Sequence, residues 1–305
     1  PNLPSELKIN NDHDESSRRA ALAHWLSDER NVLTWRSIVN RVWHWHFGQG
    51  LSPTPNDFGA MGQAPSHPEL LDWLAIWFRD EAKGSFKKLH RLILSSETYR
   101  QRVLDDPSHR GQKIDANNRL LWRMNRQRLT AEQVRDGIMQ LSGRLNSTIG
   151  GPPVLHFLHK GDQTFKNTAP PFVDYANFDP NSADGRRRAI YRFIFRTIPD
   201  PLLDALDCPD GSGTVPVRAT SSTAQQALAL LNDKFLLNHA EHMGRRIDDR
   251  HKGNIPEQVQ AAFQLILQRQ ASSPELEQFA TYITSHGLSN ACHLLLNTNE
   301  FLYLD

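Results

Sequence analysis

Four side chains within the first 70 residues are suited to binding a metal or transferring protons: His46, Asp57, His67 and Glu69. Histidine and carboxylate groups are ligands for divalent metals, and they also serve as general acids and bases. The segment 51–65, rich in Pro, Gly, Asn and Asp, is expected to fold back so that the four groups meet. The spacing matches no established metal or hydrolase signature. The identity of the metal, and whether the chain is an enzyme, therefore stay open.

His44 and His46 lie two residues apart in a segment with helical periodicity. Two residues correspond to about 200° of rotation around a helix, so the two side chains face opposite ways. We expect His46, which shares an apolar stripe with Val39 and Val42, to point inward and His44 to face solvent. His46 is then either a hydrogen-bonded structural residue or, as the alternative, a general base or metal ligand.

The two candidates further along the chain also have structural interpretations. Ser66 and Glu69 have the spacing of a capping box, in which Glu69 would serve the start of a helix. His67 lies in the first turn of that helix, where a surface or packing role is the alternative to chemistry. The proposed convergence of the candidates is therefore a hypothesis that rests on the fold of the intervening loop.

Basic residues are concentrated in the middle of the chain. The stretch 100–144 holds ten Lys and Arg against five Asp and Glu, whereas 256–305 holds one against five. Arginine binds carboxylates and phosphates through paired hydrogen bonds, so we name Arg41 and Arg100 as ligand-binding candidates that would orient an anionic group. The alternative is a set of internal ion pairs with carboxylates such as Asp72, Glu97 and Asp136.

Tryptophan is plentiful near the N-terminal candidates, at Trp43, Trp45, Trp73 and Trp77. Indole rings stack on sugars, so these residues are candidate platforms for a carbohydrate. At helical spacing such residues more often belong to a hydrophobic core. Both interpretations stay open at the level of sequence.

Composition limits the class of protein. The chain has 305 residues with 38% hydrophobic and 23% charged residues and a net charge of +1, which is typical of a globular protein and excludes collagen-like or disordered chains. This balance gives no drive toward nucleic acid, and no apolar run is long enough to span a membrane. Cys208 and Cys292 are compatible with one disulfide or two free thiols, and no C-x-x-C motif is present.

Periodicity predicts an all-α, two-lobed, irregular helical fold. We expect an N-terminal helical lobe at 15–145, a loop-rich connection at 146–185 with a short hairpin as an option, and a C-terminal helical lobe at 186–305. Gly48 should end the helix that carries His46, and a capping box should start a helix at Thr130. Further helices are expected from Leu120 and over 187–196, 223–231, 233–248, 256–268, 274–285 and 289–296.

Several segments together resemble the planctomycete-specific domain known as domain of unknown function 1553. The most specific are Trp-His-Trp-His-Phe-Gly-Gln-Gly-Leu from Trp43 and Ser-His-Pro-Glu-Leu-Leu-Asp-Trp-Leu from Ser66. The resemblance extends from about Arg18 to Asp305, with one departure at Ala224-Gln225, where relatives tend to have Pro-Leu. The remaining segments are Asn40–Leu51, Thr54–Gly59, Leu89–Ile93, Thr98–Gln101, Asn118–Arg123, Arg187–Tyr191, Gln225–Asp233 and Asn299–Leu302.

The resemblance implies a domain of an exported bacterial multidomain protein, located in the periplasm or at the cell surface, that follows a cytochrome-c-like region. The chain opens at Pro1, so we expect it to be a piece of something longer. The implied function is a binding or scaffold module that contacts neighbouring domains of the same polypeptide or a glycan. The alternative is an enzyme that acts on polysaccharide at the His/carboxylate site. No cofactor is expected in this chain beyond a divalent metal at that site.

Overall fold

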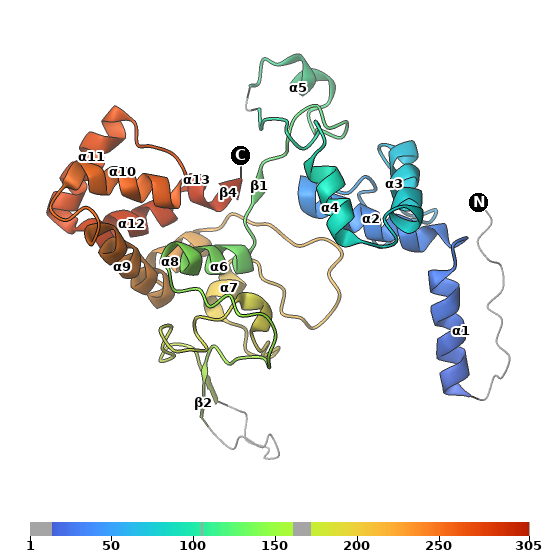
Figure 1. Cartoon of the computed structure of the whole chain (residues 1–305), viewed down its shortest axis with the longest axis horizontal. Helices are drawn as coiled ribbons and strands as arrows, with labels where there is room; N and C mark the ends of the chain where they lie inside the picture. Colours follow the sequence, from blue (N-terminus) through green and yellow to red (C-terminus); the bar gives the residue numbers. More distant parts are fainter. Residues whose placement is uncertain (1–13, 105, 161–171, 305) are drawn as a thin grey trace. The chain divides into compact units, whose positions relative to one another are not determined.

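The structure is a computed structural model that describes residues 14–104, 106–160 and 172–304 (Figure 1). These residues are mostly helical, as predicted, but four short strands make a strictly all-α description too narrow. The chain packs into two compact units: unit 1 ends at Gln127, and unit 2 runs from Arg128 to Leu304. None of the described helices has the length and apolar character needed to cross a lipid bilayer.

Within residues 14–104 and 106–127, unit 1 contains five helices: α1 (Glu15–Ser27), α2 (Val32–Phe47), α3 (Pro68–Asp80), α4 (Phe86–Leu94) and α5 (Arg110–Ile114). As predicted, α2 ends at Gly48, whose φ of 76° is the left-handed conformation that glycine adopts without strain. The capping box predicted at Ser66 is wrong. His67 is the residue before α3, and the Ser66 hydroxyl lies 3.3 Å from the Leu51 carbonyl oxygen instead.

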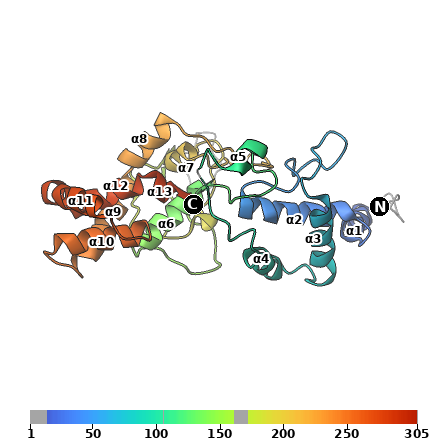
Figure 2. The same cartoon turned by 90° about the horizontal axis from the view of Figure 1, so that it is seen from above.

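The core of unit 1 lies where α2, α3 and α4 pack together (Figure 2). Each helix contributes one apolar stripe, as 3.6-residue periodicity predicts. Burial of these stripes removes apolar surface from water and holds the three helices in one body. The fully buried side chains include Val39, Val42, Phe47, Leu71, Leu74, Phe78, Leu89 and Ile93.

The helix predicted from Leu120 does not form. Asn118 and Leu121 have φ values of 52° and 57°, which interrupt right-handed helix, and Val103 pairs with Met124 in an isolated parallel bridge. The described chain between those two residues therefore loops outward within unit 1 and returns to nearly the same place. We call the described residues 103–104 and 106–124 the excursion loop. Its two ends are adjacent because Val103 and Met124 form the bridge.

Unit 2 surrounds a larger core built mainly from its C-terminal helices. The short strands β2 (Leu158–Lys160) and β3 (Phe172–Asp174) pair antiparallel, and β1 (Gln127–Arg128) pairs with β4 (Tyr303–Leu304). The helices are α6 (Ala131–Leu141), α7 (Pro201–Ala205), α8 (Ala224–Asn232), α9 (Lys234–Asp248), α10 (Ile255–Ile266), α11 (Ser273–His286), α12 (Leu288–Leu296) and α13 (Asn299–Leu302).

Two predicted features of unit 2 have opposite outcomes. The capping box at Thr130 forms as predicted, since its side chain accepts from the Gln133 N–H while Gln133 bonds back to Thr130. The helix predicted over 187–196 is wrong, because only the turn Ala189–Tyr191 is helical. Val154 exchanges backbone hydrogen bonds with Tyr191 and Phe193, which holds this segment extended.

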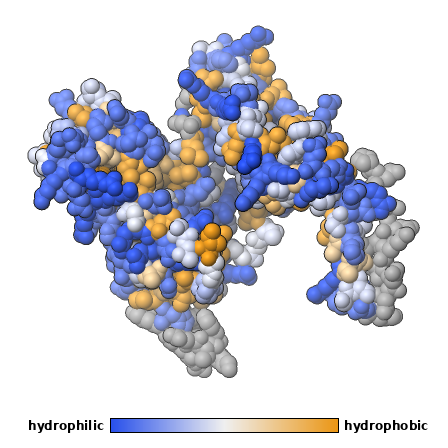
Figure 3. All heavy atoms as spheres, in the orientation of Figure 1, coloured by the Kyte–Doolittle hydropathy of each residue, from blue (hydrophilic) through white to orange (hydrophobic). Residues whose placement is uncertain are grey.

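The boundary between the units falls earlier than the predicted connection at 146–185. The helix α6 was assigned to an N-terminal lobe at 15–145, but its buried residues Val134 and Ile138 belong to the core of unit 2. Apolar side chains also reach the surface in both units (Figure 3), for example Ile76 in unit 1 and Ile190 in unit 2.

Candidate functional site

His46 lies in the last turn of α2 and meets a second histidine that sequence analysis did not consider. Its Nε2 is 2.8 Å from Nδ1 of His90 on α4, and the Tyr99 ring packs edge-on against it. His46 is half-buried, and burial followed by the neighbouring His90 lowers its pKa. His44, expected to face solvent, is also partly buried, and burial is the first cause of its lowered pKa.

Asp57 and His67 form local hydrogen bonds with neighbours in the sequence. Asp57 accepts a hydrogen bond from the Gly59 N–H at 2.8 Å, which makes it a turn residue. His67 Nδ1 is 2.9 Å from the Ser66 hydroxyl, and Glu69 is exposed on α3. Across 14–104, 106–160 and 172–304, no group of three or more His, Cys, Asp or Glu side chains is arranged to hold a metal.

The two candidate arginines have partners within unit 1. Arg41 donates to the side-chain oxygen of Asn56. Arg100 forms an ion pair of 3.1 Å with Glu97, three residues earlier, and both side chains are largely exposed. Asp72 and Asp136 also pair with arginines, as the internal-pair alternative expected, through Arg36 and Arg135.

The excursion loop is held together by buried polar groups around Trp122. The Trp122 indole N–H donates to the Asp115 carbonyl oxygen at 2.9 Å, and the His109 ring stacks on the indole at 4.8 Å. Gly111 packs so closely that an added Cβ would lie 2.4 Å from the indole. Asn118, 1% exposed, donates to the Arg123 carbonyl oxygen at 2.7 Å. The loop is therefore held in a defined conformation. Asn118 and Trp122, which belong to the resembling segment Asn118–Arg123, make the hydrogen bonds that stabilise it.

A pocket of about 240 Å³ opens within the excursion loop and the residues that follow it. Its polar lining includes the Arg123 guanidinium, the Asp106 carboxylate and the Gln112 amide. Asp106 accepts hydrogen bonds from the Ser108 hydroxyl and N–H, which lower its pKa and keep it ionised. The apolar part of the lining is Val103, Leu104 and Pro107, and Arg126 completes it.

The tryptophans divide between core and surface. Trp43 is buried in the core of unit 1, whereas Trp45 is 66% exposed and Trp73 is 50% exposed. Trp73 stacks on Trp77, one helical turn along α3, with ring centroids 6.3 Å apart. The core interpretation therefore holds for Trp43 but not for Trp45 and Trp73, which offer indole faces to solvent.

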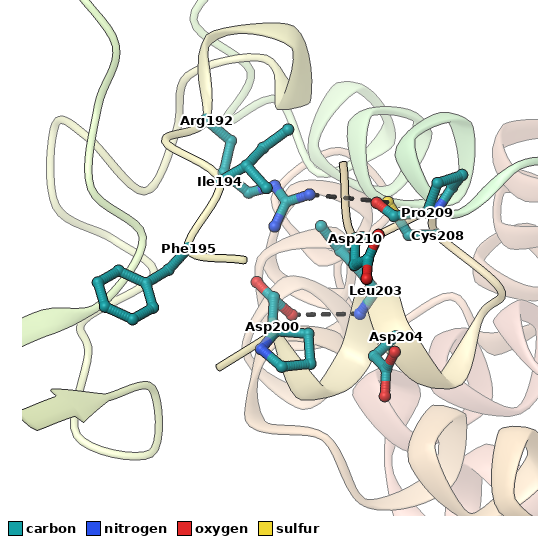
Figure 4. A pocket seen from close by; sticks show the side chains of 10 residues that line it. Arg192, Ile194, Phe195, Asp200, Leu203, Asp204, Cys208, Pro209 and Asp210 are labelled. Atoms are coloured by element: carbon teal, nitrogen blue, oxygen red, sulfur yellow. Dashed lines mark hydrogen bonds between the residues drawn. The ribbon is translucent and has the colours of Figure 1, made fainter. Parts of the chain in front are cut away.

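Unit 2 contains a crevice of about 10 Å³ beside α7 (Figure 4). Asp200 caps α7 by accepting from the Leu203 N–H, and Arg192 donates to the Cys208 sulfur at 3.6 Å. Burial and Glu132 raise the pKa of the Cys208 thiol to about 11, so the thiol is protonated and weakly nucleophilic. This volume is that of a single water, which makes the crevice a packing feature.

Unit 2 also contains a polar network that sequence analysis missed. Asp207 accepts from the Ser221 hydroxyl at 2.7 Å, from the Gln226 amide at 3.0 Å and from Arg128 at 3.2 Å. Asp207 has a φ of 64°, a strained conformation for this residue type, and these bonds compensate for the strain. The network fixes the segment that joins α7 to α8. The sequence offered one signal for this network: Gln226 lies in Gln225–Asp233, one of the segments that resemble the family.

Two histidines of unit 2 are almost fully buried. His239 has its Nδ1 2.8 Å from the Ser142 hydroxyl, and His156 has its Nε2 3.0 Å from the Asp184 carbonyl oxygen. Burial is the main cause that lowers the pKa of each to about 3, with the positive charge of Arg135 adding to it. Both rings are therefore neutral structural groups at neutral pH.

Comparison with known proteins yields one match. The model of a family described as protein of unknown function (DUF1553) matches residues 18–283. No curated protein and no solved structure matches the chain. The match includes the excursion loop, the His46–His90 contact and the Asp207 network.

Proposed function

The chain belongs to the DUF1553 family of proteins of unknown function, and from this premise we propose that it is a binding module whose unit 1 binds a sugar-sized, hydroxylated ligand. The observation that carries the proposal is the pocket of about 240 Å³ in the excursion loop. Pockets for drug-sized ligands measure about 300–1,000 Å³, so this one suits a single sugar unit.

The lining of the pocket fits the two-sided chemistry of a sugar. Hydroxyl groups both donate and accept, and the pocket offers donors from Arg123, acceptors from Asp106 and both from Gln112. The C–H face of a sugar ring packs on apolar surface, which Val103 and Leu104 supply. A purely apolar ligand would displace water from Arg123, Asp106 and Gln112 without replacing its hydrogen bonds, which costs free energy.

Arg123 is held in place while keeping donors for a ligand. Its guanidinium carbon lies 5.2 Å from the Trp122 ring centre, and it donates to the Met124 carbonyl oxygen at 3.3 Å. A guanidinium carries five N–H donors in a fixed plane, so a single bond leaves others to meet hydroxyl or carboxylate oxygens. Orientation by Trp122 reduces the conformational entropy that the side chain would lose on binding.

The biological setting is part of the same proposal. We propose that the module acts in an exported protein, in the periplasm or at the cell surface, beside further domains such as a cytochrome-c-like region. A cell-surface glycan would then be the natural source of the ligand. The exposed indoles of Trp45 and Trp73 support this choice, because exposed Trp side chains offer stacking surfaces.

The proposal is tested by a glycan-binding screen followed by calorimetry on the full chain. Substitutions Arg123→Ala and Gln112→Ala should each weaken the bound sugar about tenfold or more, which is the loss of one or two hydrogen bonds. Arg100→Ala is the matched control, since Arg100 lies outside the pocket, and should leave affinity unchanged. Failure to bind any mono- or oligosaccharide, or equal losses in the control, would contradict the proposal.

A second candidate is an enzyme that acts on polysaccharide with His46 as general base. The His46–His90 contact favours it, because a hydrogen-bonded imidazole pair can pass a proton. Asp57, His67 and Glu69 belong to this hypothesis because the sequence predicts them beside His46, and no hydrogen bond to His46 among the described residues supports them. Glycan turnover by the wild-type chain that is abolished in His46→Gln would support this candidate over simple binding.

A further inference from the structure

Two imidazoles from separate helices face each other in unit 1. His46 comes from the last turn of α2 and His90 from α4, 44 residues later. Nε2 of His46 lies 2.8 Å from Nδ1 of His90, the ring centroids are 5.0 Å apart, and the rings are inclined by 64°. In this contact one nitrogen of each ring points toward the other ring.

The dimensions of the pair are close to those of two imidazoles that share a metal ion. With metal–nitrogen bonds of about 2.0–2.1 Å and a tetrahedral angle, two ligand nitrogens lie about 3.3 Å apart. The observed pair would need to open by about half an ångström, which small side-chain rotations supply.

The surroundings favour a cation at this point. The carbonyl end of a helix carries partial negative charge, and His46 lies in the last turn of α2. Tyr99 packs edge-on against the His46 ring, which restricts the orientations that this ring can adopt.

We propose that His46 and His90 together bind one divalent transition-metal ion, through Nε2 and Nδ1 respectively, with water completing its coordination. The site replaces the partners predicted for His46, since His90 takes the place assigned to Asp57, His67 and Glu69. Two protein ligands make an exchangeable site, weaker than a zinc site with three or four. By the usual order of stability, Cu²⁺ binds it more tightly than Ni²⁺ or Zn²⁺.

The test is a titration of the full chain with Cu²⁺ alone, followed by electron paramagnetic resonance and calorimetry. We expect one tightest equivalent whose spectrum shows coupling to imidazole nitrogen. His46→Gln and His90→Gln should each weaken that equivalent at least tenfold, because each removes one of two ligands. His44→Gln is the matched control, on the same helix and facing elsewhere, and should retain the equivalent.

Several outcomes would overturn the inference. Copper binding that survives His90→Gln, or that is lost equally in His44→Gln, assigns the metal to other histidines. Circular dichroism of each variant separates loss of a ligand from loss of fold. The double variant His46→Gln/His90→Gln lacks both ligands and should bind Cu²⁺ at least as weakly as either single variant, and tighter binding would contradict the site. The metal site and the sugar pocket use different residues, so either proposal can fail while the other stands.

Discussion

The two units place their histidines differently. Unit 1 leaves the His46–His90 pair half-buried and lines a pocket of about 240 Å³ with charged groups, whereas the crevice beside α7 in unit 2 holds about 10 Å³. Unit 2 places His239 and Arg135 inside its core, where each finds hydrogen-bond partners. Polar groups at a surface are available to a ligand, and fully buried ones specify packing. Both proposed ligand sites therefore lie in unit 1, whereas His239 and Arg135 serve the packing of unit 2.

The difference in composition makes the comparison measurable. All seven tryptophans lie in unit 1, from Trp25 to Trp122, and both cysteines lie in unit 2. Tryptophan fluorescence thus reports on unit 1 alone. Hydrogen exchange measured on peptides follows α2 and α9 separately in one sample, because local stability is read segment by segment. The following predictions run from the largest expected effect to the smallest.

Acid should destabilise unit 2 more than unit 1. His239 and His156 have folded pKa values of about 3, against about 6.5 when unfolded, so the unfolded state takes up protons first. Their contribution is complete above pH 6.5 and is lost as pH falls toward 3. Between pH 7.5 and 5.0 the two groups together should remove about 4 kcal/mol of stability. Hydrogen exchange in α9 should rise accordingly, after correction for intrinsic rates.

The variant His239→Gln separates this effect from general acid sensitivity. Glutamine keeps a side-chain amide near Ser142 but does not titrate, so the pH dependence of α9 protection should fall by about half. Protection in α2 should change less over the same range, since His46 is only half-buried. Equal acid sensitivity of α2 and α9 would remove the proposed distinction between the units.

Asn40→Ala should be the most damaging single change of a polar residue in unit 1. Asn40 is fully buried, donates to the Ser52 carbonyl oxygen at 2.9 Å and accepts from the Ser52 N–H at 2.8 Å. The substitution leaves two buried backbone groups without partners, which costs about 2–3 kcal/mol. Urea unfolding followed by tryptophan fluorescence measures the loss. Asn56→Ala is the control and should cost far less, because Asn56 is an exposed residue of the loop that contains Ser52.

The sequence predicted correctly those helices whose limits depend on interactions between residues close together in the chain. The stripe of α2 and its end at Gly48 follow from periodicity and from the conformational freedom of glycine. The start of α6 follows from the reciprocal bonds of Thr130 and Gln133. In these cases the residues that determine the structure lie within one or two helical turns, so their spacing contains the information.

The wrong predictions concern segments whose conformation or partners depend on residues far away in the sequence. Leu121 belongs to an apolar pair that suggests a helix, but its left-handed backbone belongs to a loop built around Asn118 and Trp122. His46 points toward a partner, as expected for a stripe residue, yet that partner is His90 on another helix. Periodicity cannot pair helices in space, and for this reason the pocket of the excursion loop was also missed.

Thr130→Ala should have a moderate effect that is confined to unit 2. The threonine side chain accepts from the Gln133 N–H at 3.3 Å, and loss of such a cap costs about 1 kcal/mol. Ser66→Ala is the matched change in unit 1, where the serine does not cap α3. Hydrogen exchange should show faster opening at the start of α6 in the first variant and no comparable change in the first turn of α3 in the second. Similar losses at both helix starts would mean that Ser66 caps after all.

Arg100→Ala should have the smallest effect of all, although sequence analysis chose Arg100 as a ligand-binding residue. Its pair with Glu97 has side chains 61% and 88% exposed, and such pairs contribute from about 0 to 1 kcal/mol because water screens them. Fluorescence-detected unfolding should shift by less than about 0.5 kcal/mol, and less still in high salt. A larger loss, or weaker sugar binding in this variant alone, would place recognition at the exposed turn that follows α4 rather than in the excursion loop.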